Sequence, residues 1–383
     1  MTDRVRLDIN LNSITHNLHI IKNLIKLDTS KIIAVIKSDA YGHGLVEIAE
    51  HLVSEGIEFF AVANSTEAFR LIENGVPSKI LILGFEDFSN IEKVIELGCR
   101  QAVSTLEMAC KLSQKAIELK KVTPIHVKID TGLGRLGLNY EESLPLIRKI
   151  ISLPNICVEG IFTQLAAQDL MDISYQNQVR KFEYLIKKLK EENIEIPIKH
   201  ISNSSGLLRN PVHTSYFVRP GALLYGLNTF GNKLFYKYQF KEALTLSSKV
   251  ICIKTLKKGD FFGYSNSYQA KTDTVVATIP VGFADGYPRR MSNHGYVLIK
   301  ERRVPIIGTI YMNHLIIDIT DMSDINIGEE VVLIGRQGKG FISINDIALK
   351  CGTIDTEILC NISREIPRVY NYVENQVYQL GCK

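Results

Sequence analysis

The chain has 383 residues, of which 45% are hydrophobic and 22% are charged, and its formal net charge is only +4. This is the composition of an ordinary globular protein long enough for two domains, and so small a charge gives no case for nucleic acid as a partner. The first ten residues have no apolar core of signal-peptide length, and no later apolar run could span a bilayer. We therefore expect a cytoplasmic protein with no membrane partner.

Strand-like apolar runs recur through the first 225 residues and are separated mostly by helical patterns, which are clearest at 13–25 and 174–193. The eight runs occupy residues 31–36, 59–63, 79–84, 100–104, 125–130, 156–162, 198–202 and 222–226. Strands that alternate with helices predict a parallel sheet, and eight such units in about 230 residues match a (β/α)₈ TIM barrel. The connection between the seventh and eighth runs fits this pattern least well.

The pattern of apolar residues and turns in the sequence changes from about Lys241. Apolar runs at 244–256, 272–282 and 296–308 are broken by Gly, Asp and Asn turns, with little helical pattern between them. The predicted fold class is therefore α/β, with a barrel in residues 1–240 followed by a mainly β C-terminal domain in residues 241–383.

The seven cysteines and nine histidines suggest neither a disulfide framework nor a metal site. The cysteine count is odd, no two cysteines form a C-x-x-C pair, and no two histidines have H-x-x-x-H spacing. Reduced thiols and the absence of a bound metal are the expectation.

Lys37 ends the first apolar run, in the stretch AVIKSDAYGHG. Active sites of barrels lie at the carboxyl ends of their strands, so the ammonium group of Lys37 would lie at the barrel mouth among apolar neighbours. Desolvation lowers a lysine pKa, which suits Schiff-base chemistry with a carbonyl cofactor. A lysine that simply reaches solvent is the alternative.

The segment KIDTGLGRLG at 128–137 contains GLGRLG, which fits the G-x-G-x-x-G dinucleotide fingerprint. That fingerprint needs an apolar strand before the first glycine and a helix that opens at once on the pyrophosphate. Here the strand carries charged residues, and Asn139 with Glu142 predicts that the next helix begins only after the last glycine. One feature favours the fingerprint, because Glu159 lies about the right distance further along the chain. We favour a loop at the barrel mouth.

Charged side chains surround this loop. His126, Lys128 and Asp130 alternate along the fifth strand and therefore share one face, so Lys128 and the following Arg135 would point toward the barrel mouth. An ion-pair network inside the barrel is the alternative interpretation of Lys128 and Arg135.

The loops after the seventh and eighth strands are where barrels commonly hold phosphate, and they read SNSSG (202–206) and FVRPGALLYG (217–226). Asn203 and Ser204 supply hydrogen-bond donors, Gly221 allows close approach of the backbone to an oxyanion, and Arg219 supplies a permanent cation. Each signal is weak alone, but together they favour a bound phosphorylated cofactor.

With GYSNSY, VGFADGYPRR and IPRVY further along the chain, these motifs resemble, in order and spacing, the alanine racemase family of pyridoxal-phosphate enzymes (fold type III) over essentially the whole length. The resemblance implies an isomerase that interconverts L- and D-alanine with pyridoxal 5′-phosphate and supplies D-alanine for peptidoglycan. Lys37 would bind the cofactor and exchange a proton on one face of the substrate Cα. Tyr264, from the other subunit's β domain, would be the opposite base, so the active site would require a head-to-tail homodimer.

The same resemblance implies roles for the other site residues. Arg219 would face the pyridine nitrogen, and Arg135 would bond the phenolic oxygen of the cofactor and border the substrate. Lys128 matches a carbamylated lysine that holds Arg135, and Met312 matches a residue near the substrate carboxylate. The implied cofactor-binding residues are Lys37, Tyr41, Arg135, Asn203, Ser204, Arg219, Gly221, Ala222 and Thr356.

Four positions near the substrate depart from the family pattern. Gln164 stands where a histidine is usual, Asn313 replaces an aspartate, and Phe283 and Thr356 replace two tyrosines of the entry channel. Thr356 would leave room for a side chain larger than methyl. A racemase that prefers serine or acts broadly is therefore the second hypothesis. A non-enzymatic pyridoxal-phosphate-binding barrel is the third, although it would lack residues 241–383.

Overall fold

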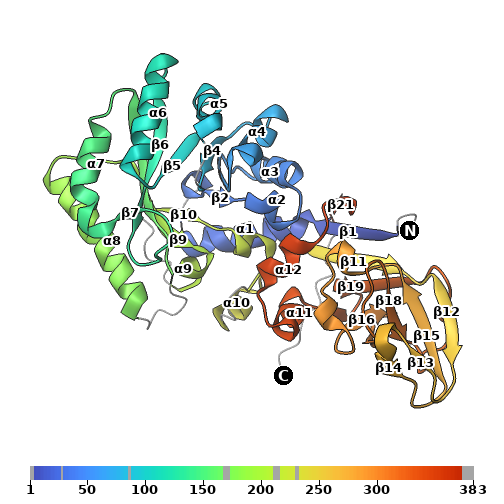
Figure 1. The fold of residues 1–383 in the computed structure, drawn as a ribbon. Coiled ribbons are helices and arrows are strands. Elements are labelled where there is room, and N and C mark those ends of the chain that lie inside the picture. Colours follow the sequence, from blue (N-terminus) through green and yellow to red (C-terminus); the bar gives the residue numbers. More distant parts are fainter. Residues whose placement is uncertain are drawn as a thin grey trace.

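The computed structural model describes residues 4–26, 29–84, 88–166, 173–209, 216–228 and 233–372. Figure 1 shows two bodies along one chain, an α/β body whose helices surround a sheet and a second body made mainly of strands. Within the described residues, no helix is long and apolar enough to cross a membrane.

The first body is a parallel barrel. In sheet order its strands are β2 (Ala34–Val35), β3 (Phe59–Val62), β4 (Lys79–Ile82), β5 (Arg100–Val103), β6 (Thr123–Asp130), β8 (Ile156–Thr163), β9 (Ile198–Asn203) and β10 (Phe217–Arg219), and the short β7 (Leu138–Asn139) pairs with β6. A parallel bridge between Ile32 and Val218, with a 2.8 Å hydrogen bond from the Ile33 N–H to the Val218 carbonyl, joins the last strand to the first. The predicted barrel is confirmed.

Helices cover the outside of this barrel (Figure 1). They are α1 (Leu11–Ile25), α3 (Leu45–Ser54), α4 (Ser65–Glu73), α5 (Ile91–Glu96), α6 (Leu106–Glu118), α7 (Ser143–Ile151), α8 (Ile173–Glu191), α9 (Ser204–Arg209) and α10 (Lys233–Tyr238), whereas α2 (Lys37–Tyr41) is a short left-handed turn directly after β2. The side chains of Asn10, Asn64 and Thr105 each accept a hydrogen bond from an N–H three residues later, so these polar residues determine where α1, α4 and α6 begin.

The alternation of side chains along the barrel strands separates two cores. Val127 and Ile129 of β6 face outward into the cluster that includes the covering helices, whereas Phe162 and Val35 belong to a smaller cluster inside the barrel. His126 and Lys128 of β6 are also buried, at 0% and 4% exposure. The interior of the barrel is therefore polar on the side formed by β6, which is where the predicted site lies.

The eighth strand is not where the sequence pattern predicted it. Residues 222–226 do not form a strand, since Ala222–Tyr225 is a 3₁₀ helix, and the strand is Phe217–Arg219 immediately before it. The 3₁₀ helix packs against α1 and buries Tyr225 completely. A short apolar run indicates burial but does not distinguish a buried strand from a buried helical turn, which explains the error.

The second body is mainly β, as predicted. One ten-stranded sheet contains β12 (Cys252–Leu256), β15 (Thr274–Ile279), β18 (Leu315–Asp318), β17 (Arg302–Ile307), β16 (Tyr296–Ile299), β19 (Glu330–Gln337), β11 (Leu244–Lys249), β1 (Val5–Asn10), β21 (Arg368–Asn371) and β20 (Gly340–Ile342). A hairpin of β13 (Phe261–Phe262) and β14 (Tyr268–Gln269) and the helices α11 (Ile344–Cys351) and α12 (Asp355–Asn361) complete it.

The first strand of the chain belongs to this second sheet. β1 pairs antiparallel with β11 and parallel with β21, although the sequence assigned residues 1–240 to the barrel. The two ends of the described chain therefore meet in one sheet, which ties the second body to the start of the first.

Candidate active site

Lys37 comes directly after β2, at the carboxyl end of the barrel, and is half-buried. Burial lowers the pKa of its ammonium group, and the nearby positive charge of Arg135 lowers it further. The direction of this shift is the one expected from the sequence. A lysine in this setting is more often neutral than a solvated one, and the neutral amine is the form that attacks a carbonyl.

The backbone that follows Lys37 is strained. Residues 38–41 all have left-handed conformations, with φ between +52° and +56°, although none of them is glycine. Such residues cost roughly 1–2 kcal/mol each and persist only where their surroundings compensate. Glu67 supplies part of that compensation, because its carboxylate accepts the Asp39 N–H at 3.0 Å and the Ala63 N–H at 2.9 Å. The turn after β2 is thereby joined to the loop after β3.

His43 and Asp39 complete the restraint of this turn. The Nδ1 of His43 lies 3.1 Å from the Ala40 carbonyl and 3.0 Å from the Tyr41 carbonyl, so this nitrogen carries the proton. Burial lowers the pKa of His43 to about 4, which keeps the ring neutral. The Asp39 carboxylate accepts the Leu45 N–H at 3.2 Å and is paired with Arg70 at 3.1 Å. Together these contacts set the directions of Lys37 and Tyr41.

A cradle for an anion lies beside Lys37. The Ser204 hydroxyl accepts the Gly221 N–H at 3.0 Å and the Leu223 N–H at 3.3 Å, which brings the loops after β9 and β10 together. A Cβ on Gly221 would lie only 2.6 Å from the Tyr41 hydroxyl oxygen and 3.3 Å from the Val35 Cβ. Burial raises the pKa of Tyr41, so its hydroxyl remains a donor. The Ser204 and Tyr41 hydroxyls can donate to a phosphate oxygen at a place that only glycine leaves open.

Asn203 has other partners. Its Oδ1 accepts the Gly206 N–H at 2.9 Å and its Nδ2 donates to the Leu165 carbonyl at 3.4 Å, so the side chain supports α9. Ala222 begins the 3₁₀ helix next to the cradle, and Thr356 lies half-buried on α12, which packs against α2 beneath Lys37.

Arg219 ends β10 and is only 3% exposed. One guanidinium nitrogen donates to His200 Nδ1 at 2.9 Å, and the other donates to the Thr163 carbonyl at 2.8 Å and to the Gln164 side-chain oxygen at 3.2 Å. Burial lowers the pKa of Arg219 to about 9, so the group stays charged at neutral pH. Gln164 therefore contacts the arginine from the position where the family resemblance leads one to expect a histidine.

Lys128 lies among cations. Burial and the charges of Arg135, Arg219 and Lys37 lower the pKa of Lys128 to about 8, and its ammonium nitrogen is 5.7 Å from the centre of the Phe162 ring. Arg135 itself is exposed. Because a fourth positive charge is unfavourable among three others, Lys128 is the residue here whose conversion to an anion would improve the electrostatics.

The glycine-rich loop does not offer its backbone to a ligand. The Asp130 carboxylate accepts the N–H groups of Gly132, Leu133 and Gly134, each at 2.9 Å in its shortest contact. Those donors are the ones a pyrophosphate would need. Asn139 then caps a short 3₁₀ turn, and α7 begins at Ser143, after the last glycine. The structure thus agrees with a loop rather than a dinucleotide site.

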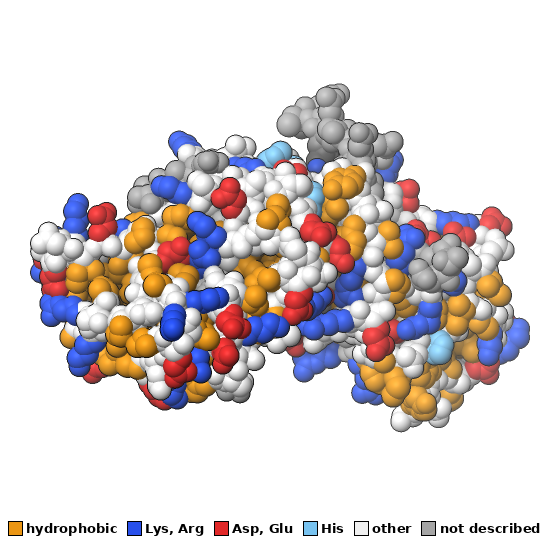
Figure 2. Space-filling model, turned by 90° about the horizontal axis from the view of Figure 1, so that it is seen from above, with side chains coloured by type: hydrophobic (Ala, Val, Ile, Leu, Met, Phe, Trp, Pro, Cys, Tyr) orange, Lys and Arg blue, Asp and Glu red, His pale blue; other side chains and the backbone are white. Residues whose placement is uncertain are grey.

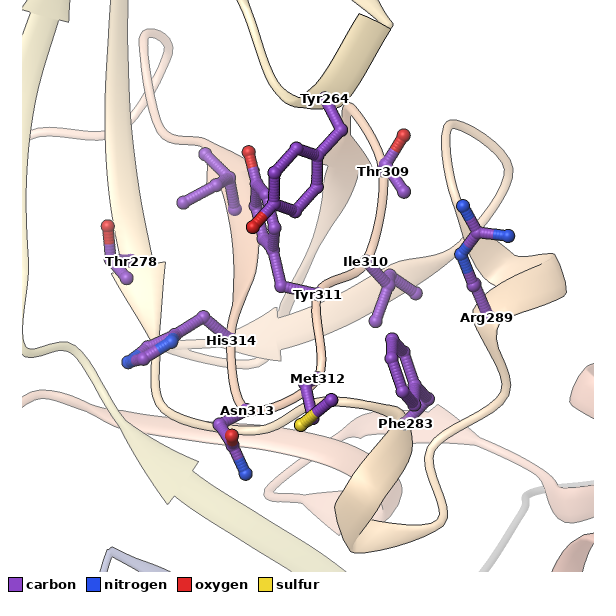
Figure 3. A pocket seen from close by; sticks show the side chains of 11 residues that line it. Tyr264, Thr278, Phe283, Arg289, Thr309, Ile310, Tyr311, Met312, Asn313 and His314 are labelled. Atoms are coloured by element: carbon purple, nitrogen blue, oxygen red, sulfur yellow. The ribbon is translucent and has the colours of Figure 1, made fainter.

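A second candidate surface lies on the β body. Tyr264, between β13 and β14, is 74% exposed, and Met312 is 58% exposed. Figure 3 shows both side chains in a hollow that also contains Phe283 and Asn313, with the Tyr264 ring against Tyr311 at a centroid distance of 5.4 Å. The β13–β14 hairpin is at the end of the β body away from the barrel (Figure 1). Within one chain, therefore, Tyr264 and Lys37 belong to different surfaces.

Several residues of the site gave no signal in the sequence. Glu67 is part of an ordinary helical pattern, and His200 lies in an apolar strand. Cys360 also lies close to the site: burial raises the pKa of its thiol, and the nearby charge of Lys37 partly opposes that rise. Within the described ranges no group of His, Cys, Asp and Glu could hold a metal ion.

Known proteins resemble the chain over nearly its whole length. The model of the N-terminal domain of alanine racemase matches residues 9–229, and that of the C-terminal domain matches residues 243–370. Alanine racemase 1 of Caldanaerobacter subterraneus subsp. tengcongensis is 37% identical over 369 residues, which cover 96% of this chain and 95% of that protein.

Solved structures give the same result. Alanine racemase of Clostridium difficile 630 superposes with a TM-score of 0.89 at 35% identity, covering 97% of this chain and 96% of that one. Alanine racemase of Bartonella henselae with covalently bound pyridoxal phosphate gives 0.84 at 26% identity, covering 96% and 99%. The chain belongs to the alanine racemase family.

Proposed function

We propose that this chain is a pyridoxal-phosphate-dependent racemase that interconverts L- and D-alanine, with Lys37 and Tyr264 as its two bases. The observation that carries the proposal is the convergence at one barrel rim of a half-buried lysine, a buried arginine and the cradle formed by Gly221, Ser204 and Tyr41. Pyridoxal phosphate, when bound, supplies an electron sink that acidifies the Cα–H of an amino acid.

The residues of the chain perform the remaining tasks. The cradle would bind the phosphate, and Arg219 would hold a positive charge toward the ring nitrogen because a guanidinium does not give up its proton there. Lys37 would hold the cofactor through its amine, which its lowered pKa leaves neutral more often, and would hold a proton on one face of Cα. Tyr264 acts on the other face. Two opposed bases are needed because a single base would return the proton to the face from which it came.

The active site is shared in a head-to-tail homodimer. Support comes from the exposed Tyr264 and Met312, which lie in a hollow of the β body, while Lys37 lies on the barrel. A second copy turned end to end would bring the hollow of each chain over the barrel mouth of the other, and such closed pairing is the commonest symmetry of soluble oligomers.

Lys128 carries a carbamate in the active enzyme. Near pH 8 a substantial fraction of its amine is neutral, and its nitrogen can bond to the carbon of CO₂ while one N–H proton leaves to water. The amine becomes an anion, which pairs with Arg135 and holds that side chain toward the cofactor.

The enzyme works in the cytoplasm, where all six described cysteines would remain free thiols, as they are in this structure, and supplies D-alanine for peptidoglycan.

The test is α-proton exchange in deuterated water with the cofactor-loaded protein. Alanine should exchange and racemise, and borohydride reduction should attach the cofactor to Lys37 in a peptide map. The absence of both α-proton exchange and a cofactor-dependent absorption band would overturn the proposal. Mixing Lys37→Ala with Tyr264→Phe chains tests the shared site, because a mixed dimer would contain one site with both wild-type bases and regain activity.

Serine or a broader range of amino acids is the second candidate substrate. Thr356 replaces a tyrosine at the entry, and Phe283 and Asn313 lie with Tyr264 in the hollow, so the substrate side of the site differs from the family pattern more than the cofactor side does. Exchange measured in parallel with alanine, serine, lysine and arginine decides between the two candidates.

A further inference from the structure

A chain of polar side chains runs through the barrel interior from Arg219 toward the opposite end of the strands. Arg219, at the carboxyl end of β10, contacts His200 of β9, and His200 contacts His126 of β6 at 2.8 Å. His126 contacts the Glu159 carboxylate of β8 at 3.3 Å, and Glu159 is paired with Arg100, the first residue of β5, at 2.9 Å. We call these five residues the arginine relay.

The direction of every hydrogen bond in the relay follows from its two ends. A guanidinium only donates, so His200 Nδ1 accepts from Arg219 and the ring proton of His200 is on Nε2. That proton points to His126 Nδ1, which must accept, so the proton of His126 is on its own Nε2 and is donated to Glu159. A carboxylate only accepts hydrogen bonds, so Glu159 at the far end provides the acceptor that the His126 Nε2–H requires.

The local structure is adapted to the relay. A Cβ on Gly160 would lie 2.4 Å from His126 Nδ1, so glycine beside Glu159 is what admits the ring. The pairing of β6 with β8 also shifts its register between Ile125 and His126. His200 stacks on Phe162 with ring centroids 4.5 Å apart, which fixes its plane.

The charges are arranged so that the histidines stay neutral. Burial lowers the pKa of His126 and lowers that of His200 well below its usual value. Burial opposes ionisation of Glu159, but hydrogen bonds from His126 and Arg100 outweigh it and lower the pKa of Glu159 to about 2. The relay therefore has a fixed cation at each end, a carboxylate next to Arg100, and two oriented neutral rings between them.

We propose that Glu159 is a positioning residue of the enzyme: it accepts the last proton of the donor order that Arg219 starts, and by holding His126 and His200 in place it keeps Arg219 aimed at the cofactor ring. The proposal rests on the proposed role of Arg219. It also accounts for Glu159, whose spacing from the glycine motif had favoured a dinucleotide site. Glu159 touches neither the cofactor nor the substrate in this scheme, so its effect is exerted only through the two rings.

The experiment compares two substitutions in the cofactor-loaded enzyme. Glu159→Leu removes the acceptor, whereas Glu159→Gln keeps one oxygen that can accept from His126 but removes the charge and the second oxygen, which accepts from Arg100 at 3.3 Å. Glu192→Gln is the control, because Glu192 is paired with Arg148 through two guanidinium nitrogens in the same way but on the surface and with no histidine contact. The first readout is ¹⁵N NMR of histidine-labelled protein, which reports which ring nitrogen carries the proton.

In the wild-type enzyme and in Glu192→Gln, His126 and His200 should both be protonated at Nε2. Glu159→Leu should leave the His126 Nε2–H without its acceptor and so loosen both rings: the signals of His126 and His200 should change, and with them the visible absorption of the bound cofactor. It should also lower kcat by about 10-fold or more, the effect of losing a hydrogen bond to a charged group. Glu159→Gln should retain the Nε2 proton and recover much of kcat.

Two results would overturn the inference. One is an Nδ1 proton on either ring in the wild-type protein, and the other is a Glu159→Leu protein in which the signals of both rings and the cofactor absorption are unchanged. If Glu159→Leu does not fold, the ring protonation of the wild-type and of Glu159→Gln still decides. Failure of the racemase proposal is recognised separately, because it would appear as a lack of α-proton exchange in the wild-type enzyme whatever the histidines show.

Discussion

Replacement of Gly221 by alanine tests the phosphate cradle with a single methyl group. The added Cβ would lie 2.6 Å from the Tyr41 hydroxyl oxygen, so the two atoms must separate by on the order of 0.7–1 Å to reach ordinary contact. Tyr41 cannot yield freely, because it ends the left-handed turn and its ring packs on the buried Tyr225 at a centroid distance of 4.9 Å. The loop that holds the Gly221 N–H must move instead.

Crowding of this kind costs roughly 1–3 kcal/mol in a packed site. If that cost falls on the cofactor-bound state, cofactor affinity decreases by about 5- to 150-fold. Titration of the apoenzyme with pyridoxal phosphate, followed by absorbance, measures the change. Gly206→Ala is the matched control, because the nearest atom to a Cβ there is the end of the Leu165 side chain, at 3.0 Å, the other neighbours are in ordinary contact at 3.5 Å or more, and the position lies in a helix that prefers alanine. A folded Gly221→Ala enzyme whose affinity stays within about twofold of wild type would refute the reasoning.

Three further predictions concern the residues around Lys37. Glu67→Gln leaves one oxygen for two buried N–H groups, so the free energy of unfolding should fall by about 1–3 kcal/mol in urea titrations; unchanged stability would contradict the proposed restraint. The pKa of His43 is about 4 in the folded chain and about 6.5 in the unfolded chain. The free energy of unfolding should therefore be highest above pH 6.5 and fall by up to about 3 kcal/mol as the pH decreases toward 4. In a plot of the urea unfolding midpoint against pH, His43→Gln should reduce the slope between pH 4 and 6.5. An unchanged slope would count against the buried neutral ring. With ¹³C-bicarbonate, a carbamate signal should appear in ¹³C NMR of the enzyme and be absent from Lys128→Met; equal spectra would exclude the carbamate.

Part of the fold and site could be predicted because the relevant signals are local. The alternation of apolar runs with helical patterns reflects which faces must be buried, so it predicted a barrel and a β body. Lys37 was recognisable because it ends the first run, and a parallel barrel collects the carboxyl ends of its strands on one rim. The charges at Lys128 and Asp130 argued against a dinucleotide strand, and Asp130 indeed occupies the N–H groups of the glycine loop.

Other features depend on contacts that the sequence does not display. No local propensity indicates four consecutive left-handed residues in SDAY, because the strain is compensated by Glu67, which lies in α4. The 222–226 run was assigned to a strand because burial is common to strands and 3₁₀ turns. Figure 2 shows hydrophobic, acidic and basic side chains intermixed over one face of the molecule, so surface charge alone would not have located the site either.

The sequence by itself determined the order of strands and helices, the two-body plan and the residue types available at the barrel mouth, because periodicity and strand ends are properties of neighbouring residues. Only the tertiary structure decided how those residues act. His126 and His200 are 74 positions apart along the chain yet share a 2.8 Å hydrogen bond, and Arg219 and Glu159 direct that bond from opposite ends. The physical reason is that hydrogen-bond direction and desolvation depend on distances in space, which are set only when the barrel closes.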